Sequence, residues 1–225
     1  MNAPYRNLLT PLLEAQAASW ADRNDSKVVA GFGESAEERA TAFANLALID
    51  LSPLPRVGMK GADLDDWLSA GNYQVGDTPN GAWEQADGTL IARLSADELL
   101  LLADPRQSTP AAFAAIGIES YQCYALRRRD SHCWLAVSGE NAAAMLAKLC
   151  SMDFSAGAFD NHAVAQTLIA TMPGIVIRHD IDEQPVFYLL GDASMARYLW
   201  DCIEDAMTEF SGRLLGVSAL PDDSR

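Results

Sequence analysis

Basic residues are scarce in this chain of 225 residues, which carries 16 Lys and Arg against 31 Asp and Glu. The net charge of −15 disfavours a nucleic-acid partner, because phosphates are bound by Lys and Arg. Long apolar runs are missing too, and no stretch approaches the length of a membrane-spanning helix. No charged segment followed by an apolar run opens the chain, so we expect neither a signal peptide nor a membrane partner.

Cysteine is infrequent, and the four cysteines share no C-x-x-C spacing: they are Cys123, Cys133, Cys150 and Cys202. Without a secretory signal, we expect reduced thiols and a cytoplasmic location. The composition, 49% hydrophobic and 21% charged, is that of an ordinary globular protein. The length is enough for one folded unit with a substantial core.

Familiar catalytic motifs are absent as well. The run Asp-Ser-His at 130–132 has the residue types of a hydrolytic triad, but neighbours on an extended chain point to alternate sides. His132, His162 and His179 lie on separate segments without metal-ligand spacing, so we expect no metal site. The run GFGESA at 31–36 superficially matches a dinucleotide fingerprint, yet the strand before it is short and no βαβ unit surrounds it.

What the sequence does contain is a pattern that occurs twice. Leu48–Gly61 has the same length as Leu126–Gly139, and each segment ends in a glycine that opens an apolar helix. The two glycines are 78 residues apart. In the second copy we expect a strand at 133–137 and a helix at 140–149.

Two shorter markers extend this pattern. Thr-Leu-Ile-Ala at 89–92 recurs at 167–170, again 78 residues later. Leu-Leu-Ala-Asp at 101–104 is matched by Leu-Leu-Gly-Asp at 189–192, which is 88 residues later. We therefore place an insertion of about ten residues between these two markers in the second copy. Three markers in the same order predict a duplicated unit.

The duplication divides one folded unit into segments. We expect an Ala-rich helical segment at 1–45, a first half at 46–118, a second half at 121–215 and a loose polar tail at 216–225. A strand–helix–hairpin–helix unit leaves one sheet face bare, so two copies would bury each other. We predict an α+β fold of two interlocked halves with mixed sheets.

Several local elements are predicted by their own signals. Ser35 and Glu38 form a capping box, which predicts a helix from Ala36 to about Leu46. We also expect a hairpin of 89–94 with 98–102, a helix from Ser108 or Thr109 to about 116, and a long last helix at 194–210. Trp67, Trp134 and Trp200 fall on apolar faces and are expected in the core, whereas Trp83 falls in a predicted loop and is a candidate pocket wall.

The repeated segments also resemble a known superfamily. Ala47–Leu54 (ALIDLSPL), followed by Gly61–Leu68 (GADLDDWL), is similar to the N-terminal signature of aminomethyltransferases, the glycine-cleavage T-proteins. Their folate-binding fold is likewise a duplication with interlocked halves. The second half is more similar to the gamma subunit family of heterotetrameric sarcosine oxidases. The segments that carry this similarity are Arg128–Gly139, Ala147–Asp153, Ala158–Phe159, Ala165–Thr167 and Ala196–Trp200.

This resemblance implies a part in a larger enzyme. Heterotetrameric sarcosine oxidases oxidise the N-methyl group of sarcosine on flavin and pass the one-carbon unit to tetrahydrofolate. The family implies alpha, beta and delta subunits as partners, with flavin and NAD on the large subunits. Folate is bound there by a T-protein-like part of the alpha subunit, and the gamma subunit shares that fold without an established chemical role.

The chain departs from the T-protein pattern where folate chemistry would occur. The family's acidic segment corresponds to Gly88–Leu94, in which the two acid positions hold Ala92 and Arg93. Neither side chain can act as a general acid or base at neutral pH. Where the family holds the pterin with Glu, this chain has Tyr188, with Glu183 nearby as the alternative. A folate-like pocket between the halves would therefore be lined by Trp83, Arg93, Glu183 and Tyr188, without a catalytic residue.

Arg127, Arg128 and Arg129 form a basic run in an otherwise acidic chain. One interpretation is a solvated loop that pairs with the chain's own carboxylates. The other is a contact with an anion or a partner, because Arg suits bidentate recognition of carboxylates.

Two functions follow from the sequence. We expect a non-catalytic, gamma-like subunit of a sarcosine oxidase-type complex, which predicts a broad contact patch and co-purification with flavoprotein subunits. The alternative is a stand-alone tetrahydrofolate-binding protein of the aminomethyltransferase type, which predicts a pterin pocket between the halves. Tetrahydrofolate is the one cofactor that this chain itself would bind.

Overall fold

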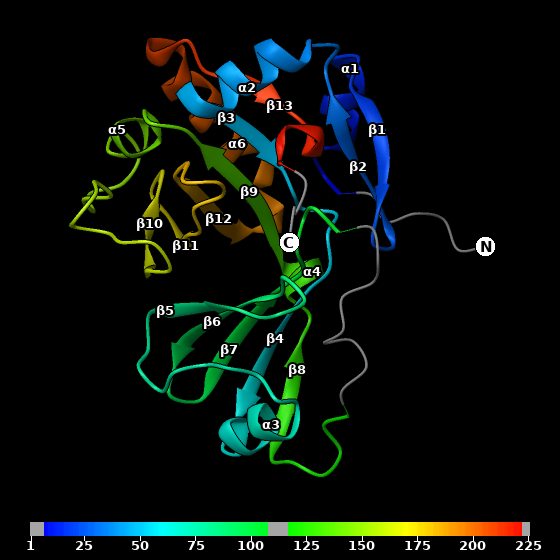
Figure 1. Ribbon diagram of the computed structural model, residues 1–225, viewed down its shortest axis with the longest axis vertical. Coiled ribbons are helices and arrows are strands. Elements are labelled where there is room, and N and C mark those ends of the chain that lie inside the picture. The colour runs from blue at the N-terminus through cyan, green and yellow to red at the C-terminus, as the bar shows by residue number, and fades with distance from the viewer. Residues whose placement is uncertain (1–6, 108–116, 222–225) are drawn as a thin grey trace.

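Two β-sheets make up the centre of the computed structural model, which describes residues 7–107 and 117–221 (Figure 1). The first sheet has antiparallel strands in the order β5-β6-β7-β4-β8. Its strands are β4 Arg56–Gly61, β5 Gly81–Glu84, β6 Leu90–Ser95, β7 Glu98–Leu102 and β8 Cys123–Leu126. The second sheet has the order β10-β11-β12-β9-β3-β13 and is mixed, because β13 runs parallel to β3. Its strands are β3 Ala47–Asp50, β9 His132–Ser138, β10 Val164–Ile169, β11 Met172–Arg178, β12 Val186–Asp192 and β13 Arg213–Leu215.

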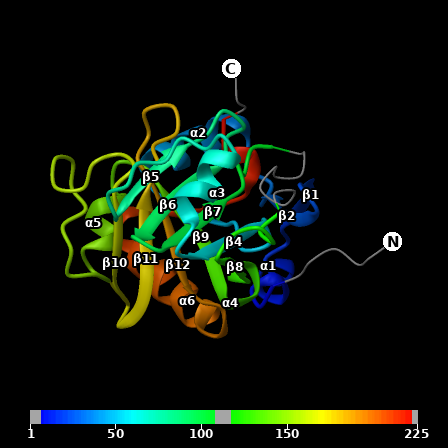
Figure 2. The ribbon, with the colours of Figure 1, turned by 90° about the horizontal axis from the view of Figure 1, so that it is seen from below.

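Helices cover the outer faces of both sheets, so the molecule has four layers. The helices α5 (Ala142–Leu146) and α6 (Ala196–Met207) pack on the outer face of the second sheet. The inner faces of the two sheets pack on each other, and α3 (Leu64–Ala70) covers the outer face of the first sheet. Figure 2, seen from below, shows α3 in front of β6 and β7.

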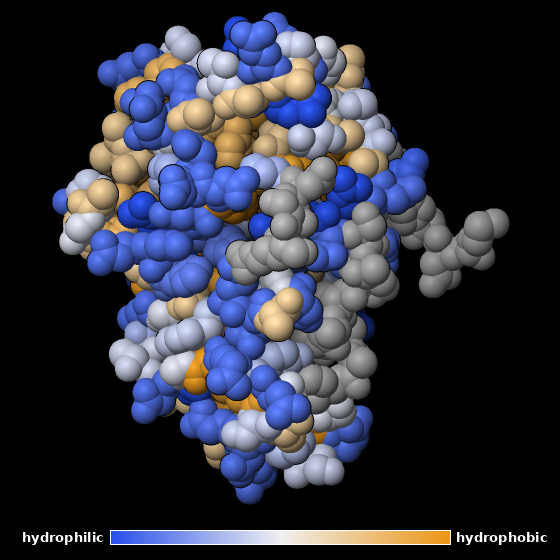
Figure 3. All heavy atoms as spheres, in the orientation of Figure 1, coloured by the Kyte–Doolittle hydropathy of each residue, from blue (hydrophilic) through white to orange (hydrophobic). Residues whose placement is uncertain are grey.

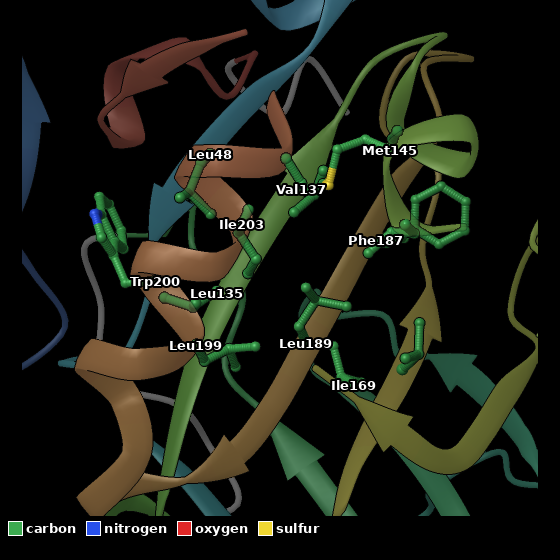
Figure 4. Packing of buried hydrophobic residues seen from close by; sticks show 14 of the residues in the cluster. Leu48, Leu135, Val137, Met145, Ile169, Phe187, Leu189, Leu199, Trp200 and Ile203 are labelled. Carbon is green, nitrogen blue, oxygen red and sulfur yellow. The ribbon is translucent and has the colours of Figure 1, made fainter. Parts of the chain in front are cut away.

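Alternate side chains of the central strands lie on opposite faces of the sheet, and both faces are buried. On β12, Phe187 and Leu189 face the helical layer, whereas Tyr188 and Leu190 face the first sheet. Figure 4 shows how side chains of α6, among them Ile203, lie over β9 and β12. This double burial explains why the central strands are apolar along their whole length.

The two halves are interlocked by an exchange of strands. The first strand of the first half, β3, pairs with β9 in the second sheet. The first strand of the second half, β8, pairs with β4 in the first sheet. Both sheets therefore have the same order of equivalent strands, with β13 added at the edge of the second. The predicted α+β fold with interlocked halves is confirmed.

Arg56 holds the point where the chain crosses between the sheets. Its side chain is 4% exposed and donates hydrogen bonds to the carbonyl oxygens of Ser52 and Leu54, at 2.9 and 3.0 Å. It also donates to the carbonyl oxygens of Arg129 and His132 on the return crossing. One guanidinium thus binds carbonyl oxygens of both crossings and ties them together.

The sequence markers of the two halves fit this topology in two cases out of three. Gly61 is the last residue of β4 and Gly139 directly follows the equivalent strand β9, and both have positive φ, 154° and 107°. The markers at 101–104 and 189–192 both end equivalent strands, β7 and β12. The match of 89–92 to 167–170 is wrong, because the first begins β6 and the second ends β10. The extra residues of the second half lie in two connections, because 147–163 before β10 is longer than 71–80 before β5, and 179–185 before β12 is longer than 96–97 before β7. Only part of the expected insertion therefore lies between the second and third markers.

The segment before the first half is only partly helical, which corrects the expectation for 1–45. It contains α1 (Thr10–Ala15), the hairpin β1 (Ser19–Arg23) with β2 (Ser26–Gly31), and α2 (Ala36–Asn45). The turn at Asn24, with φ of 52°, and the burial of β2 side chains against the second half of the chain outweigh the helical preference of the alanines. The capping box of α2 is confirmed, since Ser35 and Glu38 bond each other's backbone N–H groups.

The C-terminal segment is packed rather than loose as far as the structure describes it. A 3₁₀ turn, η4 (Val217–Ala219), packs beside β2, and Val217 and Leu220 are 2% and 5% exposed. These apolar side chains complete the inter-sheet core, which explains why the segment is held. Short 3₁₀ turns, η2 (Ala193–Met195) and η3 (Thr208–Phe210), flank α6, so the expected helix at 194–210 is confirmed in outline. The helix expected at 108–116 lies outside the described residues, and within them no helix combines the length and apolarity that a membrane span requires.

Candidate functional site

Arg93 and Trp83, two of the predicted pocket residues, lie on the outer side of the first sheet. Arg93 on β6 is 2% exposed, and its Nη2 donates to Asp65 Oδ1 of α3 at 2.6 Å. Its Nε donates to the carbonyl oxygen of Gly76 at 2.7 Å. The indole of Trp83 lies on the Cα atoms of Gly76 and Gly81, where an added Cβ would come within 2.6 and 2.8 Å of the ring. These two side chains fasten α3 and its following loop to the sheet.

Tyr188 and Glu183, the other two, lie elsewhere. Tyr188 on β12 is 1% exposed between the sheets, edge-on to Trp134 with ring centroids 5.2 Å apart. Burial raises the pKa of its hydroxyl, which has no hydrogen-bond partner among the described residues. Glu183 is exposed in the turn between β11 and β12, with φ of 65°.

The predicted four-residue pocket is therefore not formed. The reason is strand alternation: on β6, Ala92 faces the inter-sheet core while Arg93 faces α3. The position where the T-protein pattern has an acid is filled by a methyl group in an apolar layer. Trp67, Trp134 and Trp200 are each buried to 1% exposure or less, as expected for core residues.

A polar cluster lies at the edge where β5 meets the loops around β10 and β11. We name it the junction cluster, and its members are Glu84, Asp104, Arg106, His162 and His179. Arg106 binds both oxygens of Asp104, at 2.8 and 3.0 Å, and lies 3.4 Å from Glu84. The rings of His162 and His179 stack with centroids 5.5 Å apart. Burial lowers the pKa of His179 to about 4, so this imidazole is neutral at pH 7.

Sequence analysis missed the junction cluster because its five members come from four separate segments. Backbone pairing brings them together: Ala82 N donates to His162 O at 2.8 Å, and Val164 N donates to Asn80 O at 3.0 Å. These bonds join the edge strand of the first sheet to the edge strand of the second. In a duplicated fold with interlocked halves, the equivalent edge strands β5 and β10 are expected to lie side by side. The duplication was therefore the one sequence feature that could have indicated this cluster.

Two hollows share His132 on another face of the molecule. The larger, of 630 Å³, lies between Glu98 and Arg128 on one side and Gln166 to Ile175 on the other. The smaller, of 430 Å³, lies between Leu8 and the turn at 193–196. We call them together the His132 groove. Its larger part has the size of a small-molecule site.

His132 itself is held by its neighbours rather than by a catalytic carboxylate. Its Nε2 is 3.2 Å from Arg128 Nη1, and its Nδ1 is 2.8 Å from Ser131 Oγ. Burial, then the charges of Arg128 and Arg56, lower the pKa of His132 to about 4. Asp130 faces Arg127 at 3.8 Å instead, so no Asp–His–Ser relay is formed among these neighbours. The expectation of an extended chain here is wrong, because residues 128–131 form the short helix α4 and Ser131 contacts His132.

The three consecutive arginines each have a carboxylate partner in the same chain, and they differ in exposure. Arg128 pairs with Glu98, and Arg129 binds both carboxylate oxygens of Asp25 at 2.9 and 2.8 Å. The side chain of Arg127 is 89% exposed beside the groove. All three arginines therefore face carboxylates of the same chain, but the pair of Arg127 with Asp130 is exposed and leaves the charge of Arg127 accessible to solvent.

The comparisons with known proteins agree with this geometry. The family model of the GCVT N-terminal domain matches residues 9–222, and the chain belongs to this family. It is similar to the glycine cleavage system aminomethyltransferase T from Bartonella henselae, with a TM-score of 0.70 and 17% identity, over 95% of this chain and 60% of that one. It thus spans less than two thirds of the aminomethyltransferase.

A second solved structure is matched along nearly its whole length. This is a chain of the heterotetrameric sarcosine oxidase from Corynebacterium sp. U-96 in complex with pyrrole 2-carboxylate. The TM-score is 0.65 and the identity 21%, and the match covers 92% of this chain and 97% of that one. No curated protein matches the chain.

Proposed function

We propose that the chain is a non-catalytic, gamma-like subunit of a sarcosine oxidase-type complex. The observation that carries this proposal is the extent of the two structural matches. The chain covers 97% of one chain of a heterotetrameric enzyme but only 60% of an aminomethyltransferase. The described fold thus corresponds to about three fifths of the stand-alone enzyme and to nearly all of one chain of the complex.

The residues support a subunit without its own chemistry. Ala92 lies in the inter-sheet core, and Arg93 is tied to Asp65, so neither position offers a proton donor or acceptor. In the proposed complex, flavin and NAD are bound by the large subunits, and the partners are alpha, beta and delta-like chains. We place the complex in the cytoplasm, in keeping with the four free cysteines of this chain.

We place the partner contact on the face around the His132 groove. Leu168 and Leu8, which line the two parts of the groove, are 56% and 63% exposed, and Met195 and Tyr198 nearby are 40% and 43% exposed. Figure 2 shows α4 (Arg128–Ser131) and α6 along the same edge of the molecule. The face in Figure 3, by contrast, is hydrophilic across its middle. Exposed apolar side chains with a cationic rim are typical of a protein interface.

Co-purification with single substitutions tests this placement. Leu168→Asp puts a charge into the proposed contact and should lower recovery of the flavoprotein chains at least about tenfold. Tyr124→Asp is the matched control, because Tyr124 is 53% exposed on β8 at the edge of the first sheet. Equal recovery with both variants would contradict the proposed face.

A second candidate function is tetrahydrofolate binding by the chain alone. The observation that favours it is the 630 Å³ part of the His132 groove, which lies between the two halves. Titration of the purified chain with tetrahydrofolate, followed by tryptophan fluorescence, tests it. Saturable binding that Gln166→Ala weakens would favour this function, whereas no binding at millimolar ligand would exclude it.

A further inference from the structure

The junction cluster brings one carboxylate and two imidazoles together from both sheets. One potential ligand atom each from Glu84, His162 and His179 lies within 4.8 Å of the other two. Glu84 ends β5 of the first sheet, His162 precedes β10, and His179 follows β11 of the second sheet. The two histidines are 17 positions apart in the second half, and Glu84 comes from the first half.

His179 is the fixed member of this group. It is 5% exposed, and its backbone N–H donates to the carbonyl oxygen of Val186 at 2.8 Å. Its Nδ1 is buried and has no hydrogen-bond partner within the part of the chain that the structure describes. A buried polar atom without a partner costs free energy, so it indicates a group that completes the site.

We propose that Glu84, His162 and His179 bind a divalent transition-metal ion of the zinc type. Two imidazoles and one carboxylate are a common zinc donor set, and a fourth position is left for water. At metal–ligand distances of about 2.0–2.2 Å, tetrahedral ligand atoms lie roughly 3.3–3.6 Å apart, so each of these atoms has to move by at most about 1 Å. Glu84 and His162 are only half-buried and have room for this movement, and they open the site to solvent.

Arg106 competes with the metal ion for Glu84. Its Nη2 lies 3.4 Å from Glu84 Oε1, whereas it binds Asp104 at 2.8 and 3.0 Å. When Glu84 turns toward the metal ion, Arg106 keeps its bidentate pair with Asp104. The rearrangement therefore leaves no guanidinium buried without a carboxylate.

The bound ion would act as a clip between the two sheets. Glu84 belongs to the first sheet, and both histidines belong to loops of the second, so the metal ion joins edges that are also connected by backbone hydrogen bonds and by the side chain of Gln166. An ion that binds only the folded chain stabilises it by mass action. This inference does not rest on the proposed subunit function.

Zinc titration of the purified full-length chain, stripped with a chelator, tests the site. We expect one ion per chain by calorimetry and a rise in Tm with zinc concentration. His162→Ala and Glu84→Gln should each weaken zinc binding by at least about tenfold, because even the loss of an outer partner of a metal ligand costs 10–100-fold. His179→Ala removes a buried side chain and can fail to fold, so the two half-buried positions carry the test.

His132→Asn is the matched control, because it removes the third histidine of the chain at a place remote from the junction cluster. It should leave the affinity for zinc unchanged. Two outcomes would overturn the proposal. One is the absence of saturable binding by the unmodified chain, and the other is unchanged affinity in His162→Ala. Cobalt titration adds a direct readout, since an intense thiolate-to-cobalt absorption band would assign the ion to cysteines instead.

Discussion

Arg93 is a buried charge whose counter-ion lies at the surface. Its side chain is 2% exposed, while that of Asp65 is 73% exposed. Removal of the carboxylate leaves the guanidinium with only carbonyl partners, at Gly76 and Ala96. We expect Asp65→Asn to lower the free energy of unfolding by about 1–3 kcal/mol.

Urea unfolding measures this difference, and Asp66→Asn is its control. Asp66 is the next residue in the first turn of α3 and is also exposed. Both substitutions remove one negative charge from the same helix end, so they share the loss of the favourable helix-dipole interaction. Equal effects of the two substitutions would show that the ion pair with Arg93 contributes nothing.

His132 makes the stability of the fold depend on pH. Its pKa is about 4 in the folded chain, below the ordinary 6.5, mainly because burial disfavours the charged ring. Between these values the unfolded chain binds more protons, so the free energy of unfolding falls as the pH drops through this window. His132→Gln removes this dependence.

The measurement is urea unfolding of both proteins from pH 7 to pH 4. We expect the advantage of the unmodified chain over His132→Gln to shrink by about 1–2 kcal/mol over this range, after a discount for the partial exposure of the ring. A difference that does not change with pH would show that His132 is protonated alike in both states.

At the residue scale, composition and spacing identified which side chains would be buried but not which would meet. The three core tryptophans were predicted from apolar periodicity alone, because burial follows from the face of the element. Arg93, Glu183 and Tyr188 were chosen by resemblance and Trp83 by its place in a predicted loop, and the structure does not bring the four together because one position along a strand decides between two opposite faces. Ala92 and Arg93 are neighbours on β6, and their side chains lie on opposite faces of the sheet.

Two glycines end the equivalent strands of the two halves, and Gly139 shows why the element needs this residue. Its φ is 107°, and an added Cβ would lie 2.5 Å from the backbone carbonyl of Asn45 at the end of α2. The backbones of the two elements are joined here, with Glu140 N donating to Ala44 O at 2.9 Å. Gly139→Ala should therefore lower the free energy of unfolding by at least about 2 kcal/mol.

Gly157→Ala separates strain from crowding. Gly157 has φ of 87°, and an added Cβ would meet no described atom within 4 Å. This variant should cost only the backbone term, about 1 kcal/mol. Thermal and urea unfolding of both variants measure the difference, and a loss at Gly139 no larger than that at Gly157 would contradict the close approach.

Elements with a local signal were predicted well, and elements decided by tertiary packing were not. The capping box of α2 and the hairpin of β6 with β7 are encoded within a few residues. The hairpin of β1 with β2 was missed because the surrounding alanines favour helix, while its stability comes from burial of Val28 and Val29 against the rest of the chain. The repeat at 167–170 misled because four matching residues do not fix a register.

For the whole molecule, the exchange of β3 and β8 makes the two halves a single unit. We propose that 46–118 and 121–215 arose from one duplicated unit, since both sheets have the same order of equivalent strands. The junction cluster is a consequence of this arrangement, because it forms where the edge strands β5 and β10 meet. The spacing of these residues along the chain does not predict the cluster. It could have been predicted only from the way in which the two halves pair.

The central claim is that this chain works as a subunit, and purification of the tagged chain from its native cells tests it most directly. Mass spectrometry of what co-purifies should identify a large flavin-binding chain and a T-protein-like chain in constant ratio to this one, through successive columns. Recovery of the chain alone, under conditions that preserve other complexes of the same cells, would contradict the subunit function.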